Sequence, residues 1–161
     1  ANASAEGSMA IGENADADGI DSISQGTDSF AGGVADVSIG RNSNTGTGGL
    51  NTAVGIDNTV ASGTQNSLLG YDNEVTGDRN TLLGVENTVV GNSNFVGGDP
   101  NLVTGNNNLV TANDSTVTGN RNTANGNDII VSGNRNNAMG NYAFATGNAN
   151  NAIGDHASVT G

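Results

Sequence analysis

The chain has 161 residues, 26 of them glycine, with no cysteine and only 3% aromatic residues. This inventory excludes a disulfide-stapled fold and a conventional aliphatic and aromatic core. Its 16 acidic residues against four arginines give a net charge of −12. That balance argues against nucleic acid as a partner, because phosphate binding needs basic side chains. No apolar run reaches membrane-spanning length, so we expect no membrane insertion by this segment.

The first forty residues place a glycine at every seventh position from Gly12 to Gly40. Four residues before the first four of these glycines stands a small residue: Ser8, Ala15, Ser22 and Ser29. A fixed period is the signature of a repeat architecture.

Residues 41–63 disturb this interval, because Gly40 to Gly48 and Gly55 to Gly63 are each eight residues apart. An extra residue in a repeat is accommodated most easily as a bulge at a turn. We therefore predict two turn bulges and no domain boundary. Residues 1–161 are predicted to form a single domain with register insertions near 41–63.

From Gly63 to Gly161 the repeat becomes x-x-Asn-x-Val-x-Gly, and only Ala112 replaces a glycine. The asparagine and the apolar residue lie two apart, as Asn66 and Leu68 do, which is the period of a β-strand rather than of a helical heptad. Each heptad is therefore predicted to be a short strand with a tight turn at the glycine.

Two heptads bring the chain back to its starting direction, so fourteen residues should make one coil. The predicted fold class is all-β, a parallel β-solenoid with 14-residue coils. Heptad positions three and five should point inward, and positions four and six outward. Stacked inward asparagines are expected to form a hydrogen-bonded ladder.

Two heptads near the start also resemble a known family. Ser8-Met9-Ala10-Ile11-Gly12 is followed by Ala15-Asp16-Ala17-Asp18-Gly19, and related fragments recur at Val37–Gly40 and Asn151–Gly154. This alternation resembles the YadA-like head domain of trimeric autotransporter adhesins. The resemblance implies a left-handed β-roll in each chain and a homotrimer. The asparagine-rich filling after residue 57 departs from that family.

Taking every second heptad divides the outward positions into two faces. The first face is the more apolar, and an apolar stripe along a soluble protein indicates a partner surface. Since a lone thin roll buries little apolar area, burial of this face against two further copies is expected. The predicted trimer-interface residues are Met9, Ile11, Ile23, Val37, Ile39, Val54, Leu69, Leu83, Met139 and Ile153.

The second face carries threonine at fourteen-residue intervals. The candidate ligand-facing array is Thr76, Thr104, Thr118, Thr146 and Thr160. Threonine is also a good strand former, so a plain solvent-facing surface is an alternative. Grass ice-binding proteins share the x-x-Asn-x-Val-x-Gly heptad, which makes an ice-binding β-solenoid the main rival interpretation. Glu74, Leu102, Ile130 and Phe144 interrupt the neighbouring column and argue against a flat ice-matching plane.

Catalytic and metal chemistry lack suitable residues. His156 is the single histidine, in a predicted turn, so neither a histidine metal cluster nor a catalytic triad can form. Asp16, Asp18 and Asp21 do not follow the nine-residue repeat of calcium-binding rolls. We predict no enzyme, no catalytic or metal-binding residue and no cofactor.

The preferred interpretation is the head segment of a bacterial surface adhesin. It would be extracellular and anchored in the outer membrane through other parts of a longer protein. Its predicted role is cell adhesion and virulence, by attachment to extracellular matrix, to host or other cells, or to abiotic surfaces. The alternatives are the ice-binding solenoid and a purely structural spacer.

Overall fold

A computed structural model describes all residues 1–161, and the chain divides into two compact units, residues 1–80 and 81–161. Both units are parallel β-solenoids in which equivalent residues of successive coils are 14 apart, as for Asn2 and Asp16 or Thr104 and Thr118. The predicted all-β solenoid with 14-residue coils is therefore confirmed. The structure contains no helix that could serve as a membrane span. No observation tests the prediction of a single domain, which stays a prediction.

Unit 1 has two layers of parallel strands. The A layer contains β1, β3, β5, β8 and β10, and single bridges through Asn44 connect β5 with β8. The B layer contains β2, β4, β6, β7 and β9 in that order. The bounds are β1 (Asn2–Ala3), β2 (Met9–Ile11), β3 (Asp16–Ala17), β4 (Ile23–Gln25), β5 (Phe30–Ala31), β6 (Val37–Ile39), β7 (Thr52–Ile56), β8 (Thr59–Ser62), β9 (Ser67–Tyr71) and β10 (Glu74–Thr76).

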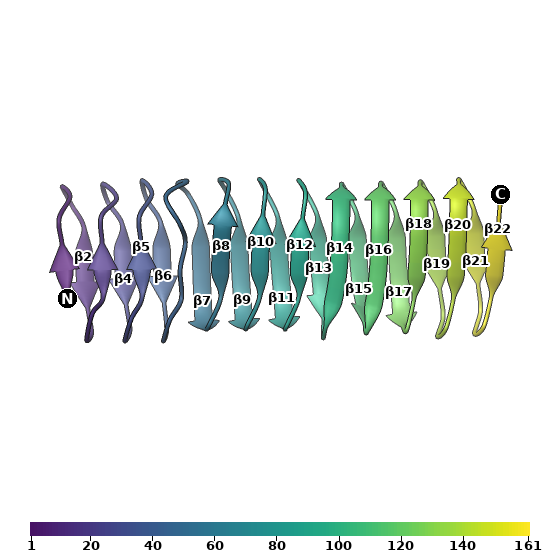
Figure 1. Cartoon of the computed structure of the whole chain (residues 1–161), viewed down its shortest axis with the longest axis horizontal. Coiled ribbons are helices and arrows are strands. Elements are labelled where there is room, and N and C mark those ends of the chain that lie inside the picture. Colours follow the sequence, from purple (N-terminus) through teal and green to yellow (C-terminus); the bar gives the residue numbers. More distant parts are fainter. The chain divides into compact units, whose positions relative to one another are not determined.

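Unit 2 has the same two layers. Its even-numbered strands form the A layer and its odd-numbered strands the B layer, and within each layer the arrows point the same way (Figure 1). The bounds are β11 (Thr81–Val85), β12 (Thr88–Val90), β13 (Phe95–Gly98), β14 (Asn101–Asn106), β15 (Leu109–Asn113), β16 (Ser115–Asn120), β17 (Thr123–Asn127), β18 (Ile130–Asn134), β19 (Asn137–Met139), β20 (Phe144–Asn148), β21 (Asn151–Ile153) and β22 (Ser158–Thr160).

The space between the layers is filled by the residues at heptad positions three and five, as predicted. Position five supplies buried apolar side chains such as Leu68, Val103 and Val117, all fully buried. Small side chains suit an interior only two strands thick, since large ones would separate the layers. Alternation of these buried residues with exposed neighbours fixes the register of every strand.

Position three supplies the predicted asparagine ladder. Asn122 donates from Nδ2 to the Gly133 carbonyl of the next coil (2.9 Å), and its Oδ1 accepts the Asn136 N–H (2.9 Å). Asn108 and Asn136 repeat this pattern, so each buried amide side chain satisfies backbone groups of the following coil. Buried polar groups cost stability unless they are paired, and here they are paired in register.

In unit 1 the same position holds serines and an acid before the asparagines begin. Asp36 is fully buried and accepts the N–H groups of Gly33 (2.9 Å) and Asn51 (2.8 Å). Asn51 then begins the ladder by accepting the Asn66 N–H (2.9 Å). The carboxylate thus takes the acceptor role of an asparagine but offers no donor to the next coil.

The turns differ from the prediction that the glycine is the tight-turn residue. The left-handed turn conformation belongs to the second residue after the glycine, such as Arg121, Asp128 or Arg135 at φ 55 to 59. The glycine itself is required by a close approach: a Cβ on Gly119 would collide with the carbonyl oxygen of Gly133 in the next coil, and its φ is +115.

Two extra residues enter unit 1, one of them where a turn bulge was predicted. Val34 pairs with Gly49, one residue more than the 14 that separate Phe30 from Asn44, so the first insertion lies within residues 45–48. The second lies inside β8, where the partners change from Val60–Val75 to Ser62–Thr76 and leave Ala61 over. This bulge is in a strand rather than at a turn.

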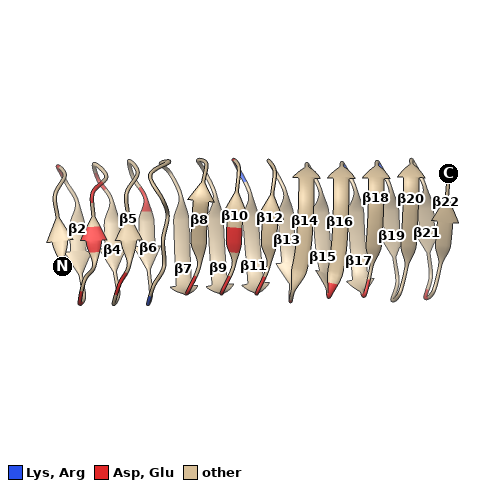
Figure 2. Ribbon diagram, in the orientation of Figure 1, with Lys and Arg blue, Asp and Glu red and all other residues tan.

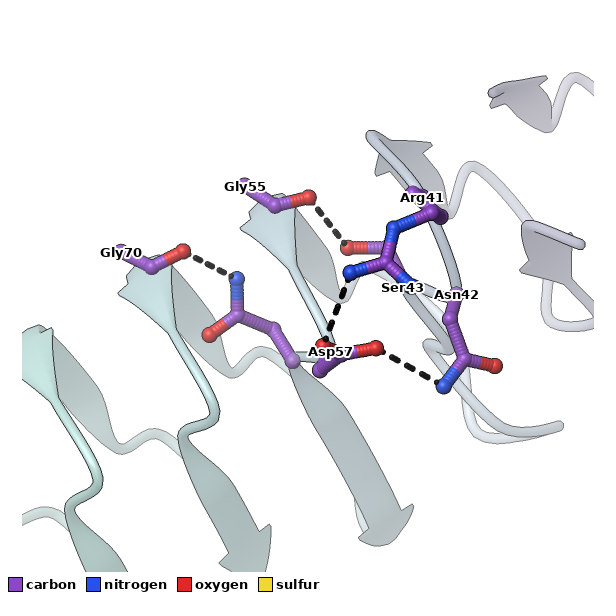
Figure 3. A network of polar contacts seen from close by, with 7 residues as sticks. Arg41, Asn42, Ser43, Gly55, Asp57 and Gly70 are labelled. Carbon is purple, nitrogen blue, oxygen red and sulfur yellow. Dashed lines mark hydrogen bonds and ion pairs between the residues drawn. The ribbon is translucent and has the colours of Figure 1, made fainter. Parts of the chain in front are cut away.

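Polar contacts join the turn before the first insertion to the segment between the two insertions. Arg41 and Asn42 both reach Asp57 of the following coil, at 3.5 and 3.0 Å, while Ser43 donates to the Gly55 carbonyl at 3.3 Å (Figure 3). The serine contact is on the interior side and continues the ladder pattern. The two edge contacts join the turns of neighbouring coils.

Candidate functional site

The most regular surface of the chain is the outward side of the A layer in unit 2, which we call the A face of unit 2. It consists of residue pairs at heptad positions four and six on consecutive strands. They are Thr88 and Val90, Leu102 and Thr104, Thr116 and Thr118, Ile130 and Ser132, Phe144 and Thr146, and Ser158 and Thr160.

These pairs repeat without a bulge. Thr104 pairs with Thr118, Thr118 with Ser132, Ser132 with Thr146 and Thr146 with Thr160. Parallel strands are spaced at about 4.7–4.9 Å, so one column presents a side chain at that interval along the stack. All members of this column after Val90 carry a hydroxyl group.

The interior holds this face in place. Between the outward residues of β14 and β16, Val103 and Val117 are fully buried against the B layer. Inner asparagines also anchor the strand ends, as the bond from Asn108 to the Gly119 carbonyl at 2.9 Å does for β16. A strand paired on both sides and pinned at its end has little freedom to bend, so the face is preorganised.

The A face of unit 2 bears no charge. All charged residues of this unit lie in turns, where Figure 2 shows the acidic residues along one edge. In unit 1 the A layer differs, because Asp16, Asp18 and Glu74 occupy its outward positions. Charged groups hold their hydration water strongly, so an uncharged face gives up or orders its water at lower cost.

Threonine gives such a face two functions at once. Its methyl group covers backbone and limits where water can sit, while its hydroxyl group can donate one hydrogen bond and also accept. Repeated at the strand spacing, this chemistry suits an ordered, extended ligand better than a small molecule.

One member of the column behaves differently from the others. Thr146 is half-buried, and its Oγ1 is covered and has no hydrogen-bond partner. The neighbouring ring on the same strand belongs to Phe144, which is 37% exposed. The sequence pattern did not indicate this covered hydroxyl, because the period alone treats all threonines of the column alike.

The structure brings together four of the five threonines predicted as a ligand-facing array. Thr104, Thr118, Thr146 and Thr160 lie in one column of unit 2. Thr76 belongs to β10 of unit 1, half-buried and paired with Ser62 beside the bulge. The neighbouring column, whose apolar members the sequence already indicated, also carries hydroxyl groups at Thr88, Thr116 and Ser158.

The predicted trimer-interface residues all lie on the outward side of the B layers. In unit 1, Met9, Ile11 and Leu69 are about half exposed, at 50, 51 and 51%, and the others are half-buried: Ile23, Val37, Ile39 and Val54. In unit 2, Leu83, Met139 and Ile153 are exposed. In each unit these apolar side chains face outward, and no observation tests their burial by other copies.

No cluster of three histidine, cysteine or acidic side chains is placed to hold a metal ion. His156 lies in a turn, exposed, and stacks on Tyr142 with the ring centroids 4.9 Å apart. A shallow depression of about 300 Å³ on the B side of unit 2 is lined by glycines together with Thr111, Asn113, Asn125 and Asn127. It has no titratable group to catalyse a reaction.

A sequence model of the family described as grass antifreeze beta roll matches residues 38–147. A search of curated proteins finds no match. The family match covers more than half of the chain and includes β14 and β16.

This match corrects several predictions. The resemblance to a YadA-like head was wrong, because the heptad belongs to a different β-roll family. The predicted adhesin function was therefore also wrong, and so were its association with virulence and its location at the bacterial outer membrane. No observation tests the predicted matrix, cell-surface or abiotic ligands, which stay predictions.

Proposed function

Because this chain belongs to the grass antifreeze β-roll family, we propose that it binds ice and that the A face of unit 2 is the surface in contact. The observation that carries the choice of face is the unbroken column of hydroxyl side chains from Thr104 to Thr160. Ice binding was the alternative interpretation of the sequence.

Ice differs from other ligands because it is a lattice that repeats in the plane of contact. A protein surface that repeats at one strand spacing can meet many lattice sites at once, whereas an irregular surface meets few. Each contact is weak, and the total grows with the number of coils in register. This requirement favours the A face over the outward side of the B layer of unit 2, which we call the B face. There the column at heptad position six runs Leu83, Gly97, Thr111, Asn125, Met139 and Ile153.

The interruptions that argued against ice at the sequence level weigh less in the structure. Glu74 lies in unit 1 and is not part of the A face of unit 2. Leu102, Ile130 and Phe144 are apolar, so they bring no tightly held hydration shell. They lie beside the hydroxyl column without breaking it, since their strands keep the 14-residue register.

The test places two charges on the proposed contact surface. In the variant Thr104→Lys/Thr118→Lys, two adjacent members of the column become long and charged, so we expect ice-recrystallisation inhibition and thermal hysteresis to be lost. The matched control is Thr111→Lys/Asn125→Lys. It alters the same heptad position on neighbouring strands β15 and β17, on the opposite face.

The control should retain activity, because its side chains point away from the ice. Equal loss in both variants would mean that added charge, not the A face, controls activity. Loss in the control alone would assign ice binding to the B face. Either result would overturn the proposed site.

We further propose that the chain acts without catalysis or a cofactor, as an antifreeze β-roll that works by adsorption. Left-handed winding of the coil and the homotrimer are carried forward as proposals. A trimer would use the B face, so it is compatible with ice contact through the A face. Sedimentation equilibrium at several protein concentrations tests the trimer, and a single monomer mass throughout would reject it.

A further inference from the structure

In the middle of unit 2, successive turns carry an acidic and a basic residue alternately. Asp114, Arg121, Asp128 and Arg135 follow one another at seven-residue intervals. Because each heptad crosses from one edge of the solenoid to the other, the two aspartates lie on one edge and the two arginines on the opposite edge. All five acids of the unit are on that first edge, which we call the acidic edge: Glu86, Asp99, Asp114, Asp128 and Asp155. Figure 2 shows acidic residues in the turns along this edge.

Arg121 and Arg135 define the arginine edge. Their backbone N–H groups bond to Asn106 and Asn120 of the preceding coils at 2.9 Å, so both residues occupy the same position on adjacent coils. Asp114 and Asp128 are fixed in the same way, through Asp99 and Asn113. The separation within each pair is therefore one strand spacing on both edges.

None of these four side chains has a hydrogen bond or an ion pair within the chain, and all four are exposed. Like charges held at one strand spacing repel each other. An edge of another molecule that carries the opposite charge at the same spacing would relieve this repulsion at both residues together. The one partner that certainly carries such an edge is a second copy of this chain.

We propose that copies adsorbed on ice pack side by side through unit 2, with the acidic edge of one against the arginine edge of the next. This inference rests on the proposed ice binding. A sideways translation brings unlike edges together and keeps every A face on the same side. Rotation about the normal to the face would bring like edges together instead. The contact is heterologous and does not close, so it extends into a row.

Adsorption is what makes so weak a contact effective. Two exposed ion pairs correspond to about a 2- to 30-fold change in an equilibrium constant, too little to hold copies together in dilute solution. On ice the copies share one plane and one orientation, and their effective concentration is high. We therefore expect the amount of protein on ice to rise more steeply with its concentration in solution as coverage increases. At high salt, which screens the ion pairs, this extra steepness should be lost.

The test uses two charge-reversed variants of the full chain. Arg121→Asp/Arg135→Asp has two acidic edges, and Asp114→Arg/Asp128→Arg has two edges that carry arginines. Both residue types already adopt the turn conformation at these positions, with φ between 52 and 59. Circular dichroism checks that each variant is folded. The measurement is the density of fluorescently labelled protein on a single ice crystal against its concentration in solution.

We expect each variant alone to need about 2- to 30-fold more protein for half coverage, with a shallower curve. A one-to-one mixture of the two should restore the wild-type curve, because the edges of one complement those of the other. The fourfold swap Asp114→Arg/Arg121→Asp/Asp128→Arg/Arg135→Asp keeps the net charge and should also match wild type. Identical curves for all proteins, or a mixture no better than its components, would overturn lateral packing. A wild-type chain that does not adsorb at all would overturn ice binding itself.

Discussion

The inner asparagine ladder predicts a large loss of stability for Asn122→Ala. Asn122 is 1% exposed, and its side chain links the turn that precedes β17 to the turn that precedes β19 in the next coil. Its Nδ2 donates to the Gly133 carbonyl at 2.9 Å, and its Oδ1 accepts the Asn136 N–H at 2.9 Å. Alanine removes both contacts and leaves the part-buried Gly133 carbonyl and the buried Asn136 N–H without these bonds.

The magnitude follows from those two orphaned groups. A buried polar group that loses its partner costs about 1–3 kcal/mol, so the substitution should cost about 2–6 kcal/mol of unfolding free energy. That is a large share of the roughly 5–15 kcal/mol by which folded proteins are stable. With a urea m-value of about 1–3 kcal/mol/M, the unfolding midpoint should fall by about 1 M or more.

Asn120→Ala is the matched control, two residues earlier on the same turn. Asn120 also forms a ladder, accepting the Asn106 N–H and donating to Asn134 Oδ1 at 3.0 Å each, but it is exposed. Water replaces these bonds, so the cost should stay below about 1 kcal/mol. Asn122→Ser should be intermediate, since Ser115 at an equivalent site still accepts the Ile129 N–H at 3.0 Å. Urea unfolding followed by circular dichroism that gave equal losses at Asn120 and Asn122 would refute the reasoning.

Two further substitutions test the turns and the A face. Gly98→Ala should destabilise the fold by about 3 kcal/mol or more, because its Cβ would meet the Ala112 carbonyl at a φ of +107. Gly97→Ala, whose Cβ would have no neighbour nearer than 3.8 Å, should change unfolding free energy by less than about 1 kcal/mol in the same assay. Thr146→Val removes a covered hydroxyl without a partner, so stability should hold or rise by about 1 kcal/mol. Ice-recrystallisation inhibition should persist in that variant, and its loss would show that this hydroxyl is needed at the ice surface.

The interior of the fold could be predicted from the sequence because few kinds of side chain fit between the two layers. A two-layer coil of this width admits Val103 or Leu82 at position five and an amide such as Asn108 at position three. Both patterns repeat often enough to fix the strand period and the coil length. The ladder bonds then follow, since a buried amide must find partners in the next coil.

The turns and insertions were less predictable. The left-handed position is occupied by residues as different as Leu50, Arg121 and Tyr142, so composition did not reveal it. The bulge at Ala61 also left no signal beyond an eight-residue interval, which fits a turn equally well. In both cases the backbone geometry is imposed by pairing with adjacent coils, and local sequence preference is overridden.

The same distinction explains why the parallel solenoid and its coil length were predicted correctly and the preferred function was not. Positions three, five and seven determine the coil, and unrelated β-rolls can share them because they face the same packing problem. Function depends on positions four and six and on the turns, which the repeat leaves free to vary. On the A face of unit 2 those positions carry hydroxyl and apolar groups and no charge, while the charges are confined to the edges. A resemblance carried by the interior therefore predicts architecture, and only the outward residues distinguish a surface that meets ice from one that meets another protein.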